Sequence, residues 1–146
     1  MNLKYKEFEE LTTQELYDIL RLRSEVFVVE QHCVYQDLDG KDGKAVHVLG
    51  TKNGILVAYT RIFGPGDYFK EAAIGRVLVK KKERKHGYGK IITAYSVNVI
   101  RDKFKSATIR ISAQKYLEKF YSSLGFTTVG EGYLEDGIPH IAMFME

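Results

Sequence analysis

The stretch IGRVLVKKKERKHGYGKII, from Ile74 to Ile92, decides how the rest of the chain is interpreted. It begins with an apolar run of the kind that forms a buried strand, and this run stops at a group of lysines and arginines. Gly87 and Gly89 follow with one residue between them, and a helical pattern of apolar residues then begins. The stretch therefore predicts a strand, a basic turn containing two glycines, and a helix.

A junction of this kind is suited to binding an anion. The first backbone N–H groups of a helix have no partner within it, and the helix dipole is positive at that end. Glycine has no Cβ, so the backbone can approach a ligand closely, while Arg84, Lys85 and Lys90 supply positive charge. Ile91 stands where a P-loop needs Ser or Thr, and Ile92 stands where a dinucleotide fingerprint needs its third glycine. The turn is therefore predicted to be a phosphate or pyrophosphate cradle of another type.

The rest of the chain alternates between strand and helix patterns. Thr12 and Glu15 have the spacing of a capping box at the start of a helix, and Asn53-Gly54 is a strong hairpin turn signal. Helices are predicted over residues 12–31, 89–104 and 116–124. Strands are predicted over residues 3–8, 46–51, 55–63, 72–79, 107–112, 126–133 and 138–145. This order favours a mixed α/β (α+β) sheet with helices on its faces.

Composition limits the class of protein. The 146 residues suit a single domain, 1–146, with a real hydrophobic core. The net charge of +3 is too small to indicate a nucleic-acid or membrane-surface protein. Cys33 is the only cysteine, which favours a reducing compartment. No apolar run approaches the ~20 residues of a membrane span, so no membrane partner and a cytoplasmic location are expected.

The glycine turn has the form R-x-x-G-x-G, given by Arg84, Gly87 and Gly89. This resembles the coenzyme A pyrophosphate loop, Q/R-x-x-G-x-G/A, of the GCN5-related N-acetyltransferases (GNAT). Further on, AQKYLEKFYSSLGF places Tyr121 ahead of Gly125-Phe126, as in that family's tyrosine helix. The stretches LRSEVFVVEQ, YQDLDGKD, YTRI, IGRVLV and EDGIPHIAM also resemble the ElaA-type subgroup.

The resemblance implies a GNAT fold, which has a central mixed and mostly antiparallel sheet, a splayed pair of parallel strands, and helices on both faces. It implies an N-acetyltransferase that moves the acetyl group of acetyl-CoA to an amine by direct attack, without a metal. The acceptor would be a small-molecule or peptide amine. The implied coenzyme-binding residues are Val77, Leu78, Val79, Arg84, Lys85, His86, Gly87, Tyr88, Gly89, Lys90, Gln114 and Tyr121.

Two catalytic roles follow from the resemblance and from the chemistry. Tyr121 matches the tyrosine that protonates the leaving thiolate, and a phenol still carries its proton near neutral pH. A base must accept the proton of the attacking ammonium. The candidate bases, of which Glu30 is taken as the working choice, are Glu30, His47, Glu135, Asp136 and His140. The alternative for Glu30 is an ordinary salt bridge to Arg23 or Arg76.

The acceptor pocket has no readable code. Its candidate residues are Arg23, His47, Arg76, Asp136 and His140. Arg76 lies in an otherwise apolar strand, where an unpaired charge is costly. It is predicted either to attract a substrate carboxylate or to form a buried ion pair with Glu30 or Asp136.

Other interpretations are also considered. The chain could be a binding module that holds acyl-CoA without turnover, or the basic turn could bind RNA phosphates. No RNA-binding aromatic motif accompanies the turn, so a nucleic-acid partner is not expected. DLDGKDG resembles a calcium loop but has the wrong residues at the ligand positions. A homodimer is open as an assembly.

Overall fold

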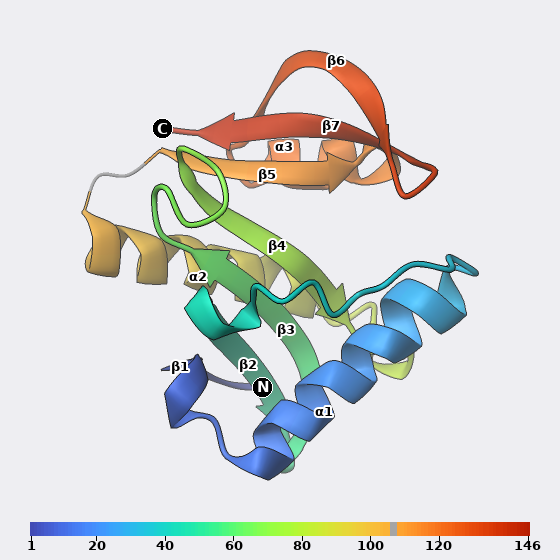
Figure 1. Cartoon of the computed structure of the whole chain (residues 1–146), viewed down its shortest axis with the longest axis vertical. Coiled ribbons are helices and arrows are strands. Elements are labelled where there is room, and N and C mark those ends of the chain that lie inside the picture. Colours follow the sequence, from blue (N-terminus) through green and yellow to red (C-terminus); the bar gives the residue numbers. More distant parts are fainter. Residues whose placement is uncertain (106–107) are drawn as a thin grey trace.

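The computed structural model describes residues 1–105 and 108–146, and within them seven strands form one sheet in the order β1-β2-β3-β4-β5-β7-β6 (Figure 1). The strands are β1 (Asn2–Glu7), β2 (Val46–Lys52), β3 (Ile55–Phe63), β4 (Ala72–Val79), β5 (Ile109–Gln114), β6 (Thr127–Glu135) and β7 (Ile138–Met145). The α-helices are α1 (Thr13–Arg23), α2 (Tyr88–Phe104) and α3 (Glu118–Ser123). Every described strand pair is antiparallel except β4–β5. This is the mixed, mostly antiparallel sheet that was predicted.

Local sequence signals determine several of these elements. Thr12 Oγ1 accepts the Glu15 N–H at 3.0 Å and the Glu15 carboxylate accepts the Thr12 N–H at 2.9 Å, so the capping box forms. Asn53 and Gly54 both have positive φ, 53° and 79°, as a tight hairpin turn requires. The strand predicted over residues 72–79 is β4. Ala107, the predicted first residue of the fifth strand, lies outside the described residues.

The helix predicted over residues 12–31 changes character at its middle. α1 ends at Arg23, and residues Ser24–Glu30 continue as a π-helix. Short π-helical segments are frequently found at functional sites. Phe27 from this segment is buried, and Gln31 follows directly after it.

Helices cover both faces of the sheet (Figure 1). Alternate residues of β3 point to opposite faces, as in any strand. Ala58 and Ile62 pack in the cluster that contains α2 residues, whereas Tyr59 packs with Ile19 and Leu22 of α1. Both layers hold the central strands β3 and β4 firmly in place.

The β4–β5 pair is short. Among the described residues, only Ala72 with Ile109 and Ala73 with Arg110 are in parallel register, and the two strands then diverge. β4 is also irregular at this point, because its pairing with β3 shifts register around Arg76, which has a φ of +48°. The predicted splayed parallel pair is therefore confirmed. Among the described residues, no helix is long and apolar enough to cross a membrane.

Candidate functional site

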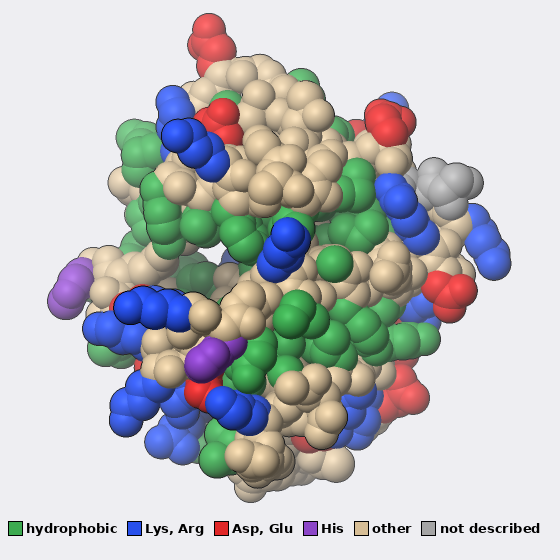
Figure 2. Space-filling view, turned by 180° about the vertical axis from the view of Figure 1, so that it is seen from behind, with side chains coloured by type: hydrophobic (Ala, Val, Ile, Leu, Met, Phe, Trp, Pro, Cys, Tyr) green, Lys and Arg blue, Asp and Glu red, His purple; other side chains and the backbone are tan. Residues whose placement is uncertain are grey.

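Two cavities lie where β4 and β5 diverge. The first, which we call the cradle cleft, has a volume of about 430 Å³ and runs from the turn before α2 along the end of β4. The second, which we call the aromatic groove, lies between β3–β4 and β5–β7. Figure 2 shows the molecule from behind, with an opening left of its centre that hydrophobic side chains border from above and from the left. Six residues line both cavities, which therefore meet: Phe27, Gln31, Val77, Gln114, Leu117 and Tyr121.

The basic turn forms one end of the cradle cleft. Lys85 and Gly87, with φ of 81° and 76°, bend the chain so that α2 starts with its N-terminus at the cleft. A Cβ added to Gly87 would meet nothing within 4 Å, so this backbone is open to a ligand. The predicted residues Lys85 to Lys90 line the cleft, except that His86 is not in its wall and instead lies beside the Tyr88 ring.

The end of β4 forms the long wall of the cradle cleft. Val77, Leu78 and Val79 all line it, as predicted. They lie beyond the last parallel pair with β5, so the β5 side of this strand is open at that point. An extended ligand can therefore lie along β4 in the place that β5 has left.

Arg84, the arginine of the predicted motif, is held by Glu30. Its two terminal nitrogens donate to the Glu30 carboxylate at 2.6 and 2.9 Å, and its Nε donates to the carbonyl of Val79 at 3.0 Å. The predicted partner of Glu30, Arg23 or Arg76, is therefore wrong. Arg84 lowers the pKa of the Glu30 carboxyl, which makes Glu30 a weaker base.

Gln114 and Gln31 lie between the two cavities. Their side-chain amides exchange two hydrogen bonds, at 3.0 and 3.3 Å. This contact joins the end of β5 to the residue that follows the π-helix, across the gap left by the splayed strands. Gln114 therefore links the two sides of the opening.

Tyr121 lies at the junction of the cavities. It comes from α3, is 4% exposed, and packs edge-on against Phe120 and Phe126. Burial raises the pKa of its phenol, so the hydroxyl keeps its proton at neutral pH. A buried phenol at this junction can donate a proton to a group that enters from the cradle cleft.

Polar side chains gather on one wall of the aromatic groove. The His140 Nδ1–H donates to the carbonyl of Ile138 at 2.7 Å, and its Nε2 lies 3.5 Å from the Glu135 carboxylate. Ser112 on β5 contacts both the Tyr133 hydroxyl and Glu135. Because the carbonyl fixes Nδ1 as a donor, Nε2 is the ring nitrogen that can accept a proton.

The opposite wall is built on a buried ionic network of three arginines and three aspartates, which are Arg23, Arg61, Arg76, Asp37, Asp39 and Asp42. Each arginine contacts two of the carboxylates, at N–O distances from 2.7 to 3.6 Å. The guanidinium groups lower the pKa of Asp39 to about 2 and also lower that of Asp42. The acidic loop that follows the π-helix is thereby fixed to α1, β3 and β4.

Several predicted acceptor contacts are corrected by this network. Arg76 forms an ion pair, but with Asp37 and Asp39 rather than with Glu30 or Asp136. Arg23 is fully buried, and so is His47, whose ring nitrogens contact the Tyr59 hydroxyl and the Asp42 carbonyl. Neither Arg23 nor His47 is in the wall of the groove.

The remaining predicted acceptor residues do meet. Arg76, Asp136 and His140 all line the aromatic groove, and so does the candidate base Glu135. Sequence reasoning missed the aromatic residues of the groove, Tyr35, Phe63, Tyr68 and Phe69, and the arginine beneath them, Arg61. Arg61 had a readable signal, because it is a charged residue within an apolar strand, as Arg76 is.

Comparison with known proteins agrees with this geometry. The family profile described as "Acetyltransferase (GNAT) domain" matches residues 8–146. The protein ElaA of Escherichia coli (strain K12) is 43% identical over 139 residues, which cover 94% of this chain and 91% of ElaA.

Solved structures are similar throughout their length. An acyl-CoA N-acyltransferase from Pseudomonas aeruginosa has a TM-score of 0.94 and 36% identity, and each chain covers 100% of the other. Escherichia coli ElaA has a TM-score of 0.92 and 40% identity, with 99% of both chains covered. An aminoglycoside 6'-N-acetyltransferase solved with coenzyme A has a TM-score of 0.70 at 15% identity, with 97% of this chain and 95% of that one covered, and so shares the fold alone.

Proposed function

The chain belongs to the acetyltransferase (GNAT) family, in the group that includes ElaA, and from this premise we propose how its own residues bind acetyl-CoA and an amine. The pyrophosphate lies on the turn from Lys85 to Lys90, and pantetheine extends along Val77–Val79. The thioester then reaches Tyr121, and the amine arrives from the aromatic groove. One observation carries this proposal: the two cavities meet at Gln114 and Tyr121.

The reaction at this junction is an acyl transfer. The neutral amine attacks the thioester carbonyl, the carbon–sulfur bond breaks, and coenzyme A leaves as a thiolate that takes the proton of Tyr121. Backbone N–H groups near the register shift of β4 stabilise the developing oxyanion. The nitrogen releases one proton as the amide forms, and through solvent this proton replaces the one that Tyr121 gave to the thiolate, so the enzyme is restored after each turnover.

His140 is the proposed base for the amine. Of the five candidates, Glu30 lies in the cradle cleft and is engaged by Arg84, and His47 is buried away from both cavities. His140 lines the groove and has Nε2 directed at Glu135, so the pair can take a proton through a water molecule. Asp136, which is exposed on the turn beside it, has no comparable partner among the described contacts.

Binding is tested first by thermal unfolding with and without acetyl-CoA. Ligand at a hundred times its Kd should add about 2.7 kcal/mol of stability. Gly89→Glu should lose this shift, because Gly89 lines the cradle cleft and has ordinary helical φ, so the added carboxylate would face the pyrophosphate without straining the backbone. Gly89→Ala is the matched control, since a Cβ there meets its nearest atom at 3.5 Å, an ordinary contact.

Turnover is tested by release of free thiol from acetyl-CoA in the presence of amines. Binding without turnover of any amine would favour a sensor over an enzyme. An RNA-binding turn would instead give no acetyl-CoA shift and steep salt dependence on RNA.

A further inference from the structure

We infer that the acceptor is an arylalkylamine, that is, a primary amine on a short chain attached to an aromatic ring, with no carboxylate beside the amine. The inference rests on the proposed function, because it assigns the chemistry of the aromatic groove as the acceptor site. Three features of the groove carry it: an aromatic end, arginines that are already neutralised, and an acidic end.

The aromatic end is formed by Phe63 and the loop that follows β3. Phe63 and Tyr68 stack with ring centroids 4.9 Å apart, and Tyr68 meets Phe69 edge-on at 4.8 Å. Tyr35 lines the groove from the opposite loop. Arg61 lies over the Phe63 ring at 5.0 Å and Arg110 over the Phe69 ring at 4.1 Å, so a flat apolar group can contact the ring edges and Tyr68, which is 40% exposed. Offset and edge-on contacts between rings are attractive beyond simple burial.

The arginines of the groove have their charge balanced by aspartates. Arg61 and Arg76 line it, but both are bound to aspartates, and the network of three arginines and three aspartates has no net charge. The Nε–H of Arg61 has no partner among the described residues, yet protein atoms cover it, so a ligand cannot reach it without moving the chain. A carboxylate on the acceptor would find no uncompensated positive charge among the residues that line the groove.

The other end of the groove carries negative charge. Glu135 and Asp136 both line it, and the Glu135 side chain is 48% exposed, with His140 as its partner at 3.5 Å. These carboxylates attract the ammonium group of an acceptor and repel any carboxylate that the acceptor carries. The groove therefore favours a cation over a zwitterion.

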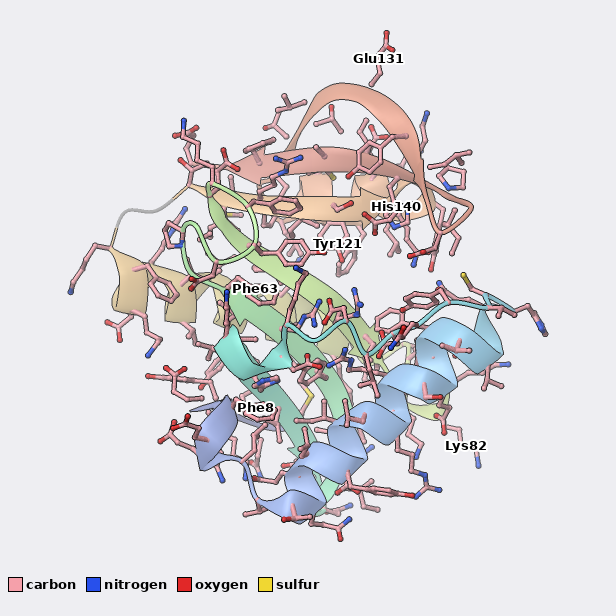
Figure 3. The ribbon with its side chains drawn as sticks, in the orientation of Figure 1. Phe8, Phe63, Lys82, Tyr121, Glu131 and His140 are labelled. Carbon is pink, nitrogen blue, oxygen red and sulfur yellow. The ribbon has the colours of Figure 1, made fainter. Side chains whose placement is uncertain are left out.

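The two ends lie on either side of the reacting position. Figure 3 shows Phe63, Tyr121 and His140 in this order across the face of the molecule, from β3, α3 and β7. An amine held between Tyr121 and His140 thus has its chain directed toward Phe63. A flat ring on that chain would lie against Tyr68 and Phe69. The ring and the amine can therefore both be bound only when the acceptor lies in this one orientation.

The test compares acceptors that differ in one group. Thiol release from acetyl-CoA is measured with phenethylamine against phenylalanine and with tyramine against tyrosine, and also with cadaverine, spermidine and a lysine-containing peptide. We expect kcat/KM for each arylalkylamine to exceed that for its amino acid by about a hundredfold, since like charges placed together across an interface are strongly disfavoured.

Variants assign the two ends. Tyr68→Leu should raise KM for phenethylamine about tenfold by removing an aromatic contact, and the KM for acetyl-CoA should stay the same. Tyr68 is 40% exposed, so the fold should tolerate the change. Glu135→Gln should lower kcat/KM for phenethylamine about tenfold, whereas Glu131→Gln should not. Glu131 is on the same strand but points away from the groove in Figure 3.

The outcomes separate this inference from the proposed function. Preference for phenylalanine, spermidine or the peptide, with acetyl-CoA binding intact, would overturn the arylalkylamine assignment and leave the acetyltransferase reaction in place. An equal effect of Glu135→Gln and Glu131→Gln would also overturn it. Absence of turnover with every amine, together with no acetyl-CoA shift, would remove the proposed function on which the inference rests.

Discussion

The cradle cleft and the aromatic groove meet at Tyr121, yet they are built in opposite ways. The anion-binding part of the cradle cleft comes from one continuous stretch, the end of β4 and the basic turn up to Lys90, and residues 26–31 and 114–121 close it. The groove is made of side chains from the π-helix, the acidic loop, β3 to β7 and the loops between them. A substitution in the basic turn can therefore change coenzyme binding alone. The shape of the aromatic groove depends instead on contacts between segments from the whole chain.

This difference explains what each side can recognise. Backbone N–H groups at a helix start bind any pyrophosphate-like group, so a short motif suffices for the coenzyme. Recognition of an acceptor needs particular side chains at particular places. Their positions depend on how distant segments pack, and a change in one loop can alter the specificity without touching the cradle.

The largest expected effect is on acetyl-CoA binding, from a substitution in the basic turn that leaves the aromatic groove unchanged. Gly87→Glu should weaken acetyl-CoA binding about a thousandfold, because a carboxylate about 4 Å from a phosphate costs about 4 kcal/mol at an effective dielectric constant of 20. Titration calorimetry with acetyl-CoA measures this. Gly66→Glu is the control, since Gly66 also has positive φ, 86° against 76°, and open space around it, but lies outside the cleft. Equal losses in both variants would assign the effect to backbone strain.

Tyr121→Phe tests the position where the cradle cleft and the aromatic groove meet. Removal of the phenol proton should lower kcat about a hundredfold, the usual scale for general acid catalysis, and leave acetyl-CoA affinity nearly unchanged. Steady-state kinetics and calorimetry together separate the two. Tyr17→Phe on α1, where the ring is 64% exposed, should have no effect. Unchanged turnover in Tyr121→Phe would exclude it as the acid.

The network beneath the groove is sensitive to acid. The folded-state pKa of Asp39 is about 2, below the value of 3.8 expected for an unfolded Asp. Its contribution to stability is therefore complete above about pH 4 and is lost as the pH falls toward 2. Asp39→Asn should destabilise the protein by about 2 kcal/mol at pH 7, the scale of a hydrogen bond to a charged group, and should flatten the acid limb of the stability curve.

Denaturant unfolding between pH 2 and pH 7 measures this. Glu15, whose pKa is also about 2, should leave a residual acid slope in the variant. A curve of unchanged slope would show that Asp39 contributes nothing to the acid sensitivity.

The smallest expected effect on acetyl-CoA affinity concerns the ion pair between Glu30 and Arg84 at the edge of the cradle cleft. Glu30→Gln should tighten acetyl-CoA binding about threefold, because it frees Arg84 and removes a negative charge, while exposed ion pairs contribute at most about 1 kcal/mol. Calorimetry with Glu25→Gln, an exposed residue of the same π-helix, is the control. Weaker binding in Glu30→Gln would mean that Glu30 positions Arg84 for the pyrophosphate.

Sequence reasoning succeeded where the cause was local. The capping box at Thr12, the Asn53-Gly54 turn and the junction of strand, glycine turn and helix each depend on neighbouring residues, and each has the predicted local structure. The apolar run of β4 was equally readable, since a buried strand needs apolar residues on both faces.

It failed where partners are distant in the chain. Arg76 was recognised as a charge that needs a partner, but nothing in its own strand indicates the carboxylate 39 positions earlier, Asp37. Glu30 likewise pairs with a residue 54 positions later, Arg84. The π-helix and the irregular backbone at Arg76 were also missed, because neither has a composition signal of its own.

The short seam between β4 and β5 has a mechanical consequence. Within the described residues, two residue pairs join β4 to β5, so the sheet consists of two parts connected by a short parallel contact. A ligand that runs along Val77–Val79 and also contacts Tyr121 would bind both parts of the sheet and restrain their motion relative to each other. Amide hydrogen exchange on β5 and β7 should then slow when acetyl-CoA binds, although the coenzyme's phosphates would contact the turn after β4, in the other part of the sheet.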